Sequence, residues 1–283
     1  MALLQMKLYA PSLKSRTNVN ILLPTPQPSI NPGMSVTSTD IGATEGFISK
    51  LGNDIPVLYL LHGSFGDEGD WQRFSRIEDY ARNYRVIVVM PAAENSSYRD
   101  LPSGRNYATW ITRELPAMIE WMFPAAKTRE GRFIAGLSMG GKGAFKLGLT
   151  NADRYSRVAS FSGGRFDEIS DQAHFEKKTV WSYGYEEGEP IRGTAEDAYW
   201  LAKNVVDAEK AGGGPKPELY LSCGTEDFLY ESNSRLHEYL DEIGYAHTYD
   251  VQPGIHNWDF WDPQIQKVLE WLPIRKLSEI RDL

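Results

Sequence analysis

One short segment constrains this chain more than any other, the sequence Arg-Phe-Ile-Ala-Gly-Leu-Ser-Met-Gly-Gly at residues 132–141. An apolar run typical of a buried strand leads directly into a Gly-x-Ser-x-Gly pattern, and a segment with helical spacing follows it. The two glycines allow a sharp turn and keep side chains away from the serine hydroxyl. This context predicts a strand–turn–helix unit that exposes Ser138 as a candidate nucleophile. A glycine-rich turn without chemistry is the alternative that the pattern alone leaves open.

Short strands and helical segments alternate along the rest of the chain. After a first strand at the start of the chain, we expect strands at residues 19–23, 57–61, 86–90, 132–135, 158–161, 218–223 and 247–251. Several are apolar at consecutive positions, which is typical of strands covered by helices on both faces. Helices are expected at residues 70–83, 109–123, 140–149, 232–243 and 262–271. This alternation predicts an α/β fold with a mostly parallel, doubly wound sheet, in which ligands bind beyond the carboxyl ends of the strands.

The length of 283 residues allows one large domain or two small ones. Two stretches interrupt the alternation of strands and helices. Residues 24–53 are rich in Pro, Gly, Ser and Thr, and we expect a long loop there. Residues 163–217 mix aromatic with acidic side chains, as an inserted cap over a site would. We therefore expect a single domain over residues 1–283, with a cap at 163–217.

A nucleophilic serine needs a base, and the chain offers few histidines: His62, His174, His237, His247 and His256. In this type of fold the serine, the acid and the histidine follow one another in that order, which excludes His62. His174 falls in the expected cap, and His237 and His247 fall in an expected helix and strand. His256 lies in a turn after a strand and before the last helix. We therefore predict that His256 is the base.

The acid is expected in the loop that follows the preceding strand. The sequence Gly-Thr-Glu-Asp-Phe at residues 224–228 offers Glu226 and Asp227 there. We favour Asp227, which would hold the histidine in the tautomer that accepts a proton from the serine. An acid that merely stabilises the start of a helix is the alternative for Asp227.

A tetrahedral intermediate also needs backbone N–H groups directed at its oxyanion. One donor is expected at Met139, the residue after the serine. The second is expected in the loop after the 57–61 strand, at Ser64, with Phe65 as the fallback. His62 is then expected to brace this loop.

Four segments together resemble a known family: Leu-Leu-His-Gly at residues 60–63, Gly-Leu-Ser-Met-Gly-Gly at 136–141, Gly-Thr-Glu-Asp at 224–227 and His-Asn-Trp at 256–258. They are similar to the esterase D family of α/β hydrolases and, within it, to bacterial tributyrin or acetyl esterases. Feruloyl esterases and S-formylglutathione hydrolases are more distant relatives. The resemblance extends over residues 8–272 and implies a serine carboxylesterase of the α/β-hydrolase fold. It also implies a triad of Ser138, Asp227 and His256.

The expected substrate is a small-molecule ester with a short acyl chain. We expect Phe65, Trp181 and Trp258 to line the mouth of the site, where aromatic rings suit a small or a flat acyl group. Feruloyl or cinnamoyl esters, thioesters of the S-formylglutathione type and acyl transfer to an alcohol stay open. A binding module with the hydrolase fold and no activity is the alternative of another class.

Composition argues against several other partners and cofactors. The net charge is −8 and no stretch concentrates basic residues, so nucleic acid is not expected. The apolar run at residues 57–61 is far shorter than the about 18–20 residues of a spanning helix, so no membrane is expected. The single cysteine, Cys223, fits a reducing compartment, with the cytoplasm as default. The acidic residues at 67, 68 and 70 are expected to form a solvated loop, and neither a metal nor an organic cofactor is expected. A homo-oligomer stays open.

Overall fold

The computed structural model describes residues 1–25, 41–166 and 191–281, and its centre is an eight-stranded sheet. The strands, in chain order, are β1 (Ala2–Ala10), β2 (Ser15–Leu23), β3 (Val57–Leu61), β4 (Ile87–Pro91), β5 (Arg132–Leu137), β6 (Arg157–Phe161), β7 (Glu218–Gly224) and β8 (His247–Gln252). Their order across the sheet is β1-β2-β4-β3-β5-β6-β7-β8. The strands β3 to β8 are parallel, and β2 pairs antiparallel with both β1 and β4. This is the mostly parallel sheet that the sequence predicts.

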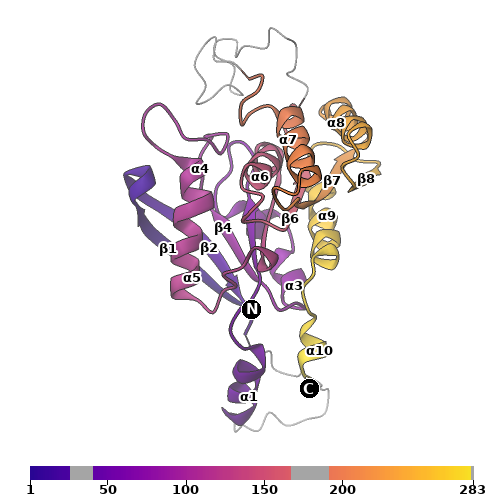
Figure 1. Ribbon diagram of the computed structural model, residues 1–283. Helices are drawn as coiled ribbons and strands as arrows, with labels where there is room; N and C mark the ends of the chain where they lie inside the picture. Colours follow the sequence, from indigo (N-terminus) through magenta and orange to yellow (C-terminus); the bar gives the residue numbers. More distant parts are fainter. Residues whose placement is uncertain (26–40, 167–190, 282–283) are drawn as a thin grey trace.

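Helices cover both faces of the sheet, and Figure 1 shows α5 and α6 in front of it. They are α1 (Ile41–Leu51), α2 (Asp70–Phe74), α3 (Ile77–Ala81), α4 (Tyr107–Thr109), a π-helical turn (Trp110–Glu114), α5 (Leu115–Met122), α6 (Met139–Thr150), α7 (Ala198–Lys210), α8 (Tyr230–Glu242), α9 (Trp258–Trp271) and α10 (Leu277–Arg281). Two short 3₁₀ turns span Pro11–Leu13 and Arg129–Gly131. Within the described ranges, no helix is long and apolar enough to cross a lipid bilayer.

The core consists of two apolar layers, one on each face of the sheet. Strand β3 contributes to both because its side chains alternate: Tyr59 belongs to the layer under α6, whereas Leu60 belongs to the layer under α9. Phe145 of α6 anchors the first layer and Ile265 of α9 anchors the second, and all four side chains are fully buried. Burial on both faces explains why β3 is apolar at five consecutive positions.

The long loop expected at residues 24–53 is wrong in its second half, where α1 forms. Phe47 and Leu51, four residues apart on one face of this helix, pack against the core. Figure 1 shows α1 beside α10, which it contacts near the end of the chain. This stretch therefore contains a short amphipathic helix, which its content of glycine, serine and threonine does not predict.

The single helix expected at residues 70–83 is also wrong, because Ser75 divides it into α2 and α3. The Ser75 hydroxyl donates to the carbonyl of Trp71 and accepts from the N–H of Ile77 at 3.2 Å. The Ser75 backbone is extended, and its side chain replaces bonds that a continuous helix would make. Asp262 accepts from the next N–H, that of Arg76, at 2.7 Å.

The stretch expected to form a cap contains helix α7. Helix α7 packs against α6 and α8 on one side of the sheet. Residues 167–190 lie outside the described residues. The expected single domain and the expected cap both stay predictions.

Candidate active site

Ser138 lies in a sharp turn between β5 and α6, with backbone angles of φ 52° and ψ −117°. This region is strained for a residue with a side chain, and such strain concentrates at functional sites. The flanking glycines are needed because the chain approaches itself closely. A Cβ on Gly136 would lie 2.4 Å from the carbonyl oxygen of Gly140, and a Cβ on Gly140 would lie 2.5 Å from that of His62. The Gly-x-Ser-x-Gly pattern therefore reflects close packing. Ser138 itself is only 7% exposed, so the expected exposure of this residue is wrong.

His256 and Asp227 come from the loops after β8 and β7, and the sheet brings them to Ser138. The Nε2 atom of His256 lies 2.9 Å from the Ser138 Oγ atom. The Nδ1 atom of His256 lies 2.8 Å and 3.1 Å from the two carboxylate oxygens of Asp227. An ionised carboxylate can only accept, so Nδ1 carries the proton and Nε2 accepts from the Ser138 hydroxyl. This arrangement can draw the proton from Ser138 during nucleophilic attack.

The carboxylate of Asp227 is buried and well supplied with donors. Burial alone would raise its pKa, but hydrogen bonds from His256, from the N–H of Leu229 and from Ser162 outweigh burial and lower the pKa of Asp227. The Leu229 bond is 2.8 Å long. Asp227 is therefore held as a carboxylate, the form that orients and stabilises a histidine that gains a proton.

Glu226, the other acid considered from the sequence, bonds to the backbone rather than to the histidine ring. Its carboxylate accepts from the N–H of Gly254 at 2.6 Å, and its own N–H donates to the Gly254 carbonyl at 3.0 Å. These bonds join the loop of Asp227 to the turn before His256. Glu226 thus aligns the two loops.

The first expected oxyanion donor directly follows the serine, and the loop of the second approaches it. Met139 is the first residue of α6, and N–H groups of a first helical turn have no partner within the helix. Gly63, which precedes Ser64, lies against the serine, since a Cβ on Gly63 would be 3.5 Å from that of Ser138. The N–H of Phe65 donates to the Asn95 side chain at 2.7 Å, which favours Ser64 over Phe65.

His62 braces the loop that contains Ser64. Its Nδ1 lies 2.7 Å from the carbonyl oxygen of Gly63, and its Nε2 accepts from the N–H of Ala93 at 3.0 Å. The hydroxyl of Tyr98 donates to the His62 carbonyl at 2.9 Å. Burial lowers the pKa of His62, so the ring stays neutral with both nitrogens bonded.

The aromatic residues expected at the mouth differ in their placement. Phe65 is 67% exposed in the loop after β3, whereas Trp181 lies outside the described residues. Trp258 lies edge-on to Trp261, with the ring centres 5.4 Å apart, and Trp261 in turn contacts His256. The contact of Trp258 with a substrate stays a prediction.

In the part of the chain that the structure describes, two aromatic rings contact His256. Trp261 lies edge-on to His256 at 4.8 Å, and its Nε1–H donates to the Ser162 hydroxyl at 3.1 Å. Phe228 also packs on the imidazole, with its ring centre 4.6 Å away, and 64% of it is exposed. Sequence reasoning assigns Phe228 no role. Its position directly after Asp227 is the available signal, because the acid loop must approach the histidine.

The described residues contain one group of three side chains close enough to hold a metal ion, and it consists of His237, Asp241 and His247. The acidic residues at positions 67, 68 and 70 do not form such a group. Asp67 instead accepts from the N–H of Gly69 at 2.7 Å within its own loop.

Comparisons with known proteins identify the family. The Esterase family model, described as putative esterase, matches residues 45–272. An acetyl esterase of Caldicellulosiruptor saccharolyticus is 29% identical, over 96% of this chain and 98% of that protein. Two solved structures of Staphylococcus aureus proteins each align with 96% of this chain and 98% of their own. The fluorophosphonate-binding serine hydrolase F is 28% identical with a TM-score of 0.77, and the S-formylglutathione hydrolase is 27% identical with a TM-score of 0.75. This chain belongs to the Esterase family and is a carboxylic ester hydrolase of the α/β-hydrolase fold.

Proposed function

We propose that the protein hydrolyses short-chain acyl esters through a catalytic triad of Ser138, His256 and Asp227. The observation that carries this proposal is the unbroken line of hydrogen bonds from the serine hydroxyl through the imidazole to the carboxylate. Such a line activates a hydroxyl that is otherwise a poor nucleophile.

In the first half of the reaction, Ser138 attacks the ester carbonyl carbon while His256 takes the hydroxyl proton. The resulting imidazolium is stabilised by Asp227. The C–O bond to the alcohol then breaks, and His256 gives its proton to the departing alkoxide. An acyl group remains bonded to the Ser138 oxygen.

In the second half, water attacks the acyl-enzyme. His256 takes a proton from the water as it attacks. The bond between the acyl carbon and the Ser138 oxygen then breaks, His256 gives its proton to that oxygen, and the carboxylic acid is released. In both halves the N–H groups of Met139 and Ser64 donate to the oxyanion. A donor of this kind contributes about 3–4 kcal/mol to the stabilisation of the transition state.

The short-chain preference is supported by the acetyl esterase relative, which matches this chain over almost its whole length. Exposed Phe228 beside His256 offers an apolar surface close to the reacting atoms. Such a surface suits a small acyl group or the alcohol of a simple ester.

A thioester substrate is the second candidate, supported by the 27% identical S-formylglutathione hydrolase. The same residues would act on it. A thiol has a pKa of about 8.5, so its thiolate is a good leaving group. Departure of a thiolate therefore depends less on the proton from His256 than departure of an alkoxide does.

The substrate proposal is tested with nitrophenyl esters from acetyl to octanoyl, together with methyl ferulate and S-formylglutathione. We expect kcat/KM to be highest for acetyl or butyryl esters and to fall with longer chains. Preference for the ferulate or the thioester would replace the short-chain assignment. A folded protein inactive on the whole panel would favour a binding module.

For location, we propose a reducing compartment such as the cytoplasm. The support is the single cysteine, Cys223, which is fully buried in β7. Burial raises the pKa of its thiol to about 12, which keeps the thiol protonated and unreactive.

A further inference from the structure

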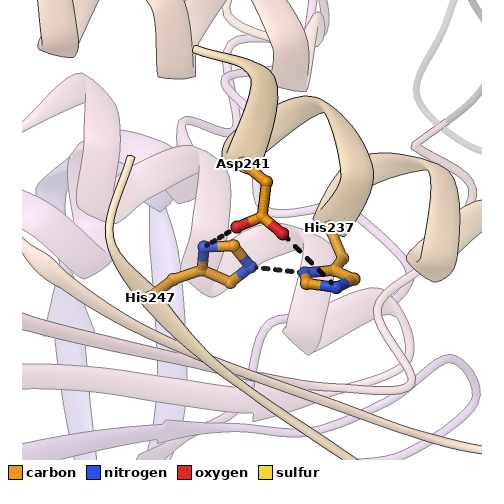
Figure 2. Close-up of side chains that lie close together, drawn as sticks. All are labelled: His237, Asp241 and His247. Atoms are coloured by element: carbon orange, nitrogen blue, oxygen red, sulfur yellow. Dashed lines mark hydrogen bonds and ion pairs between the residues drawn. The ribbon is translucent and has the colours of Figure 1, made fainter. Parts of the chain in front are cut away.

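A second cluster of chemically active side chains lies at β8, an edge strand of the sheet. His237 and Asp241 lie one turn apart on α8, and His247 is the first residue of β8. Figure 2 shows the three side chains directed at one another. One ligand atom from each residue can be chosen so that all three atoms lie within 4.8 Å. The cluster is separate from the proposed triad because His256 follows the opposite end of β8.

The His247 ring is held in the state that a metal ligand requires. Its side chain is only 1% exposed, and its Nδ1 lies 2.7 Å from the carbonyl oxygen of Tyr245. A carbonyl can only accept, so Nδ1 carries the proton and Nε2 presents a lone pair. A histidine that binds a metal usually donates its other ring N–H to a carbonyl or carboxylate in this way. The Nε2 lone pair points at the Nδ1 atom of His237, 2.8 Å away.

The other two side chains lie beside the His247 ring and are accessible from solvent. The His237 ring is stacked on Tyr249 at 4.2 Å, which fixes its plane. The carboxylate of Asp241 is 65% exposed and lies 3.7 Å from His237 Nε2 and 3.9 Å from His247 Nδ1. These distances exceed those of hydrogen bonds, so neither contact fixes the carboxylate. Asp241 also lies in the last turn of α8, where the helix dipole favours a cation.

We propose that His237, Asp241 and His247 bind a divalent transition-metal ion of the zinc type. Two imidazoles and one carboxylate match a zinc site with three protein ligands, in which water takes the fourth position. The nitrogen ligands disfavour Ca²⁺ and Mg²⁺, which prefer oxygen. Two Zn–N bonds at a tetrahedral angle place the nitrogens about 3.3 Å apart. The two rings must therefore separate by about 0.5 Å, while the exposed carboxylate turns inward.

The bound ion would join the two elements that connect the proposed acid and base. Helix α8 begins three residues after Asp227, and β8 ends four residues before His256. An ion held by both elements would stabilise this part of the fold, because a ligand that binds only the folded state raises stability. Without the ion, the two rings share one proton in a hydrogen bond. That hydrogen bond alone is the competing explanation of the cluster.

The test is titration of EDTA-treated, dialysed protein with ZnCl₂ in a calorimeter, with CoCl₂ as a spectroscopic probe. We expect one tight site per chain, visible Co²⁺ absorption of a four-coordinate ion, and a higher melting temperature with Zn²⁺. Asp241→Asn should weaken binding at least about tenfold and remove the thermal shift. His247→Gln should have the same two effects. The His247 ring is buried, so if His247→Gln does not fold, Asp241→Asn still tests the site. Glu242→Gln, which changes the adjacent acid of α8, should bind like the unchanged protein.

A His256→Ala variant separates this site from the proposed catalytic histidine, and it should take up the ion normally. The proposal is overturned if the unchanged protein binds no ion, or if Asp241→Asn binds as tightly as Glu242→Gln. It is also overturned if His256→Ala abolishes uptake, which would locate the ion at the triad. None of these results depends on esterase activity.

Discussion

The Nε2 atom of His256 lies 2.9 Å from the Oγ atom of Ser138, although 118 residues separate them in the chain. The contact arises because β5 and β8 are parallel members of one sheet, so the loops that follow them lie at the same edge. The loop after β7 adds Asp227 from between these two strands. The sheet therefore supplies the geometry, and the loops supply the chemistry.

Removal of the serine or the histidine should abolish most of the activity. For Ser138→Ala and His256→Ala we expect kcat to fall by about 10⁴ to 10⁶, because the triad acts as a unit. Steady-state kinetics on a nitrophenyl ester measures this, with circular dichroism as the check on folding. Ser278→Ala, at an exposed serine of α10, is the control. Substantial activity in either triad variant would contradict the assignment.

The two neighbouring acids should differ sharply. Asp227→Asn should lower kcat by about 10³ to 10⁴, because the histidine loses the carboxylate that fixes its tautomer. Glu226→Gln keeps an oxygen that can accept from the N–H of Gly254, so we expect activity within a few-fold of the unchanged enzyme. The reverse order of effects would mean that Glu226 is the acid.

Much of this site can be predicted from the sequence because the relevant signals are local. The glycine pattern identifies Ser138, and the scarcity of histidines leaves His256 by elimination. The choice of Asp227 over Glu226 is only a preference at that level, because adjacent side chains diverge in ways that depend on loop conformation. The structure turns Asp227 to the imidazole and Glu226 to Gly254.

The features that the sequence does not reveal depend on contacts between side chains and distant or irregular segments. Ser75 ends α2 through hydrogen bonds of its own side chain, and the hydrophobic periodicity of the sequence does not reveal such bonds. His237 and His247 fall in a separate helix and strand of the predicted fold. Their contact needs α8 to pack beside β8, which neither segment specifies by itself. Likewise, nothing in the sequence around Lys146 indicates that this lysine of α6 is buried rather than solvated.

Lys146 should contribute strongly to stability. Its ammonium is buried and donates to Glu196 and to the carbonyl of Ser97, each at 2.7 Å. Burial lowers the pKa of Lys146, although Glu196 opposes this effect. Lys146→Met should reduce the free energy of unfolding by about 3 kcal/mol, because a buried carboxylate loses a partner. Urea denaturation measures the loss, and the double variant Lys146→Met/Glu196→Gln should recover part of it. No loss in the single variant would contradict this account.

Stability at low pH should depend on Asp227. Its pKa is lower in the folded protein than the about 3.9 of an unfolded chain, so its ionised form stabilises the fold above that value. This contribution is lost as the pH falls through the folded-state pKa. Urea denaturation between about pH 6 and pH 3 should therefore show the difference between the unchanged protein and Asp227→Asn shrinking as the pH falls. A difference that stays constant would show that ionisation of Asp227 does not stabilise the fold.

The central claim is that the Ser138 hydroxyl is the nucleophile, and covalent labelling tests it most directly. The protein is treated with a fluorophosphonate, digested, and mapped by mass spectrometry. We predict that the label modifies one serine, Ser138, and that Ser138→Ala takes up none. Modification of a different serine, or a folded protein that hydrolyses esters yet leaves Ser138 unlabelled, would contradict the claim.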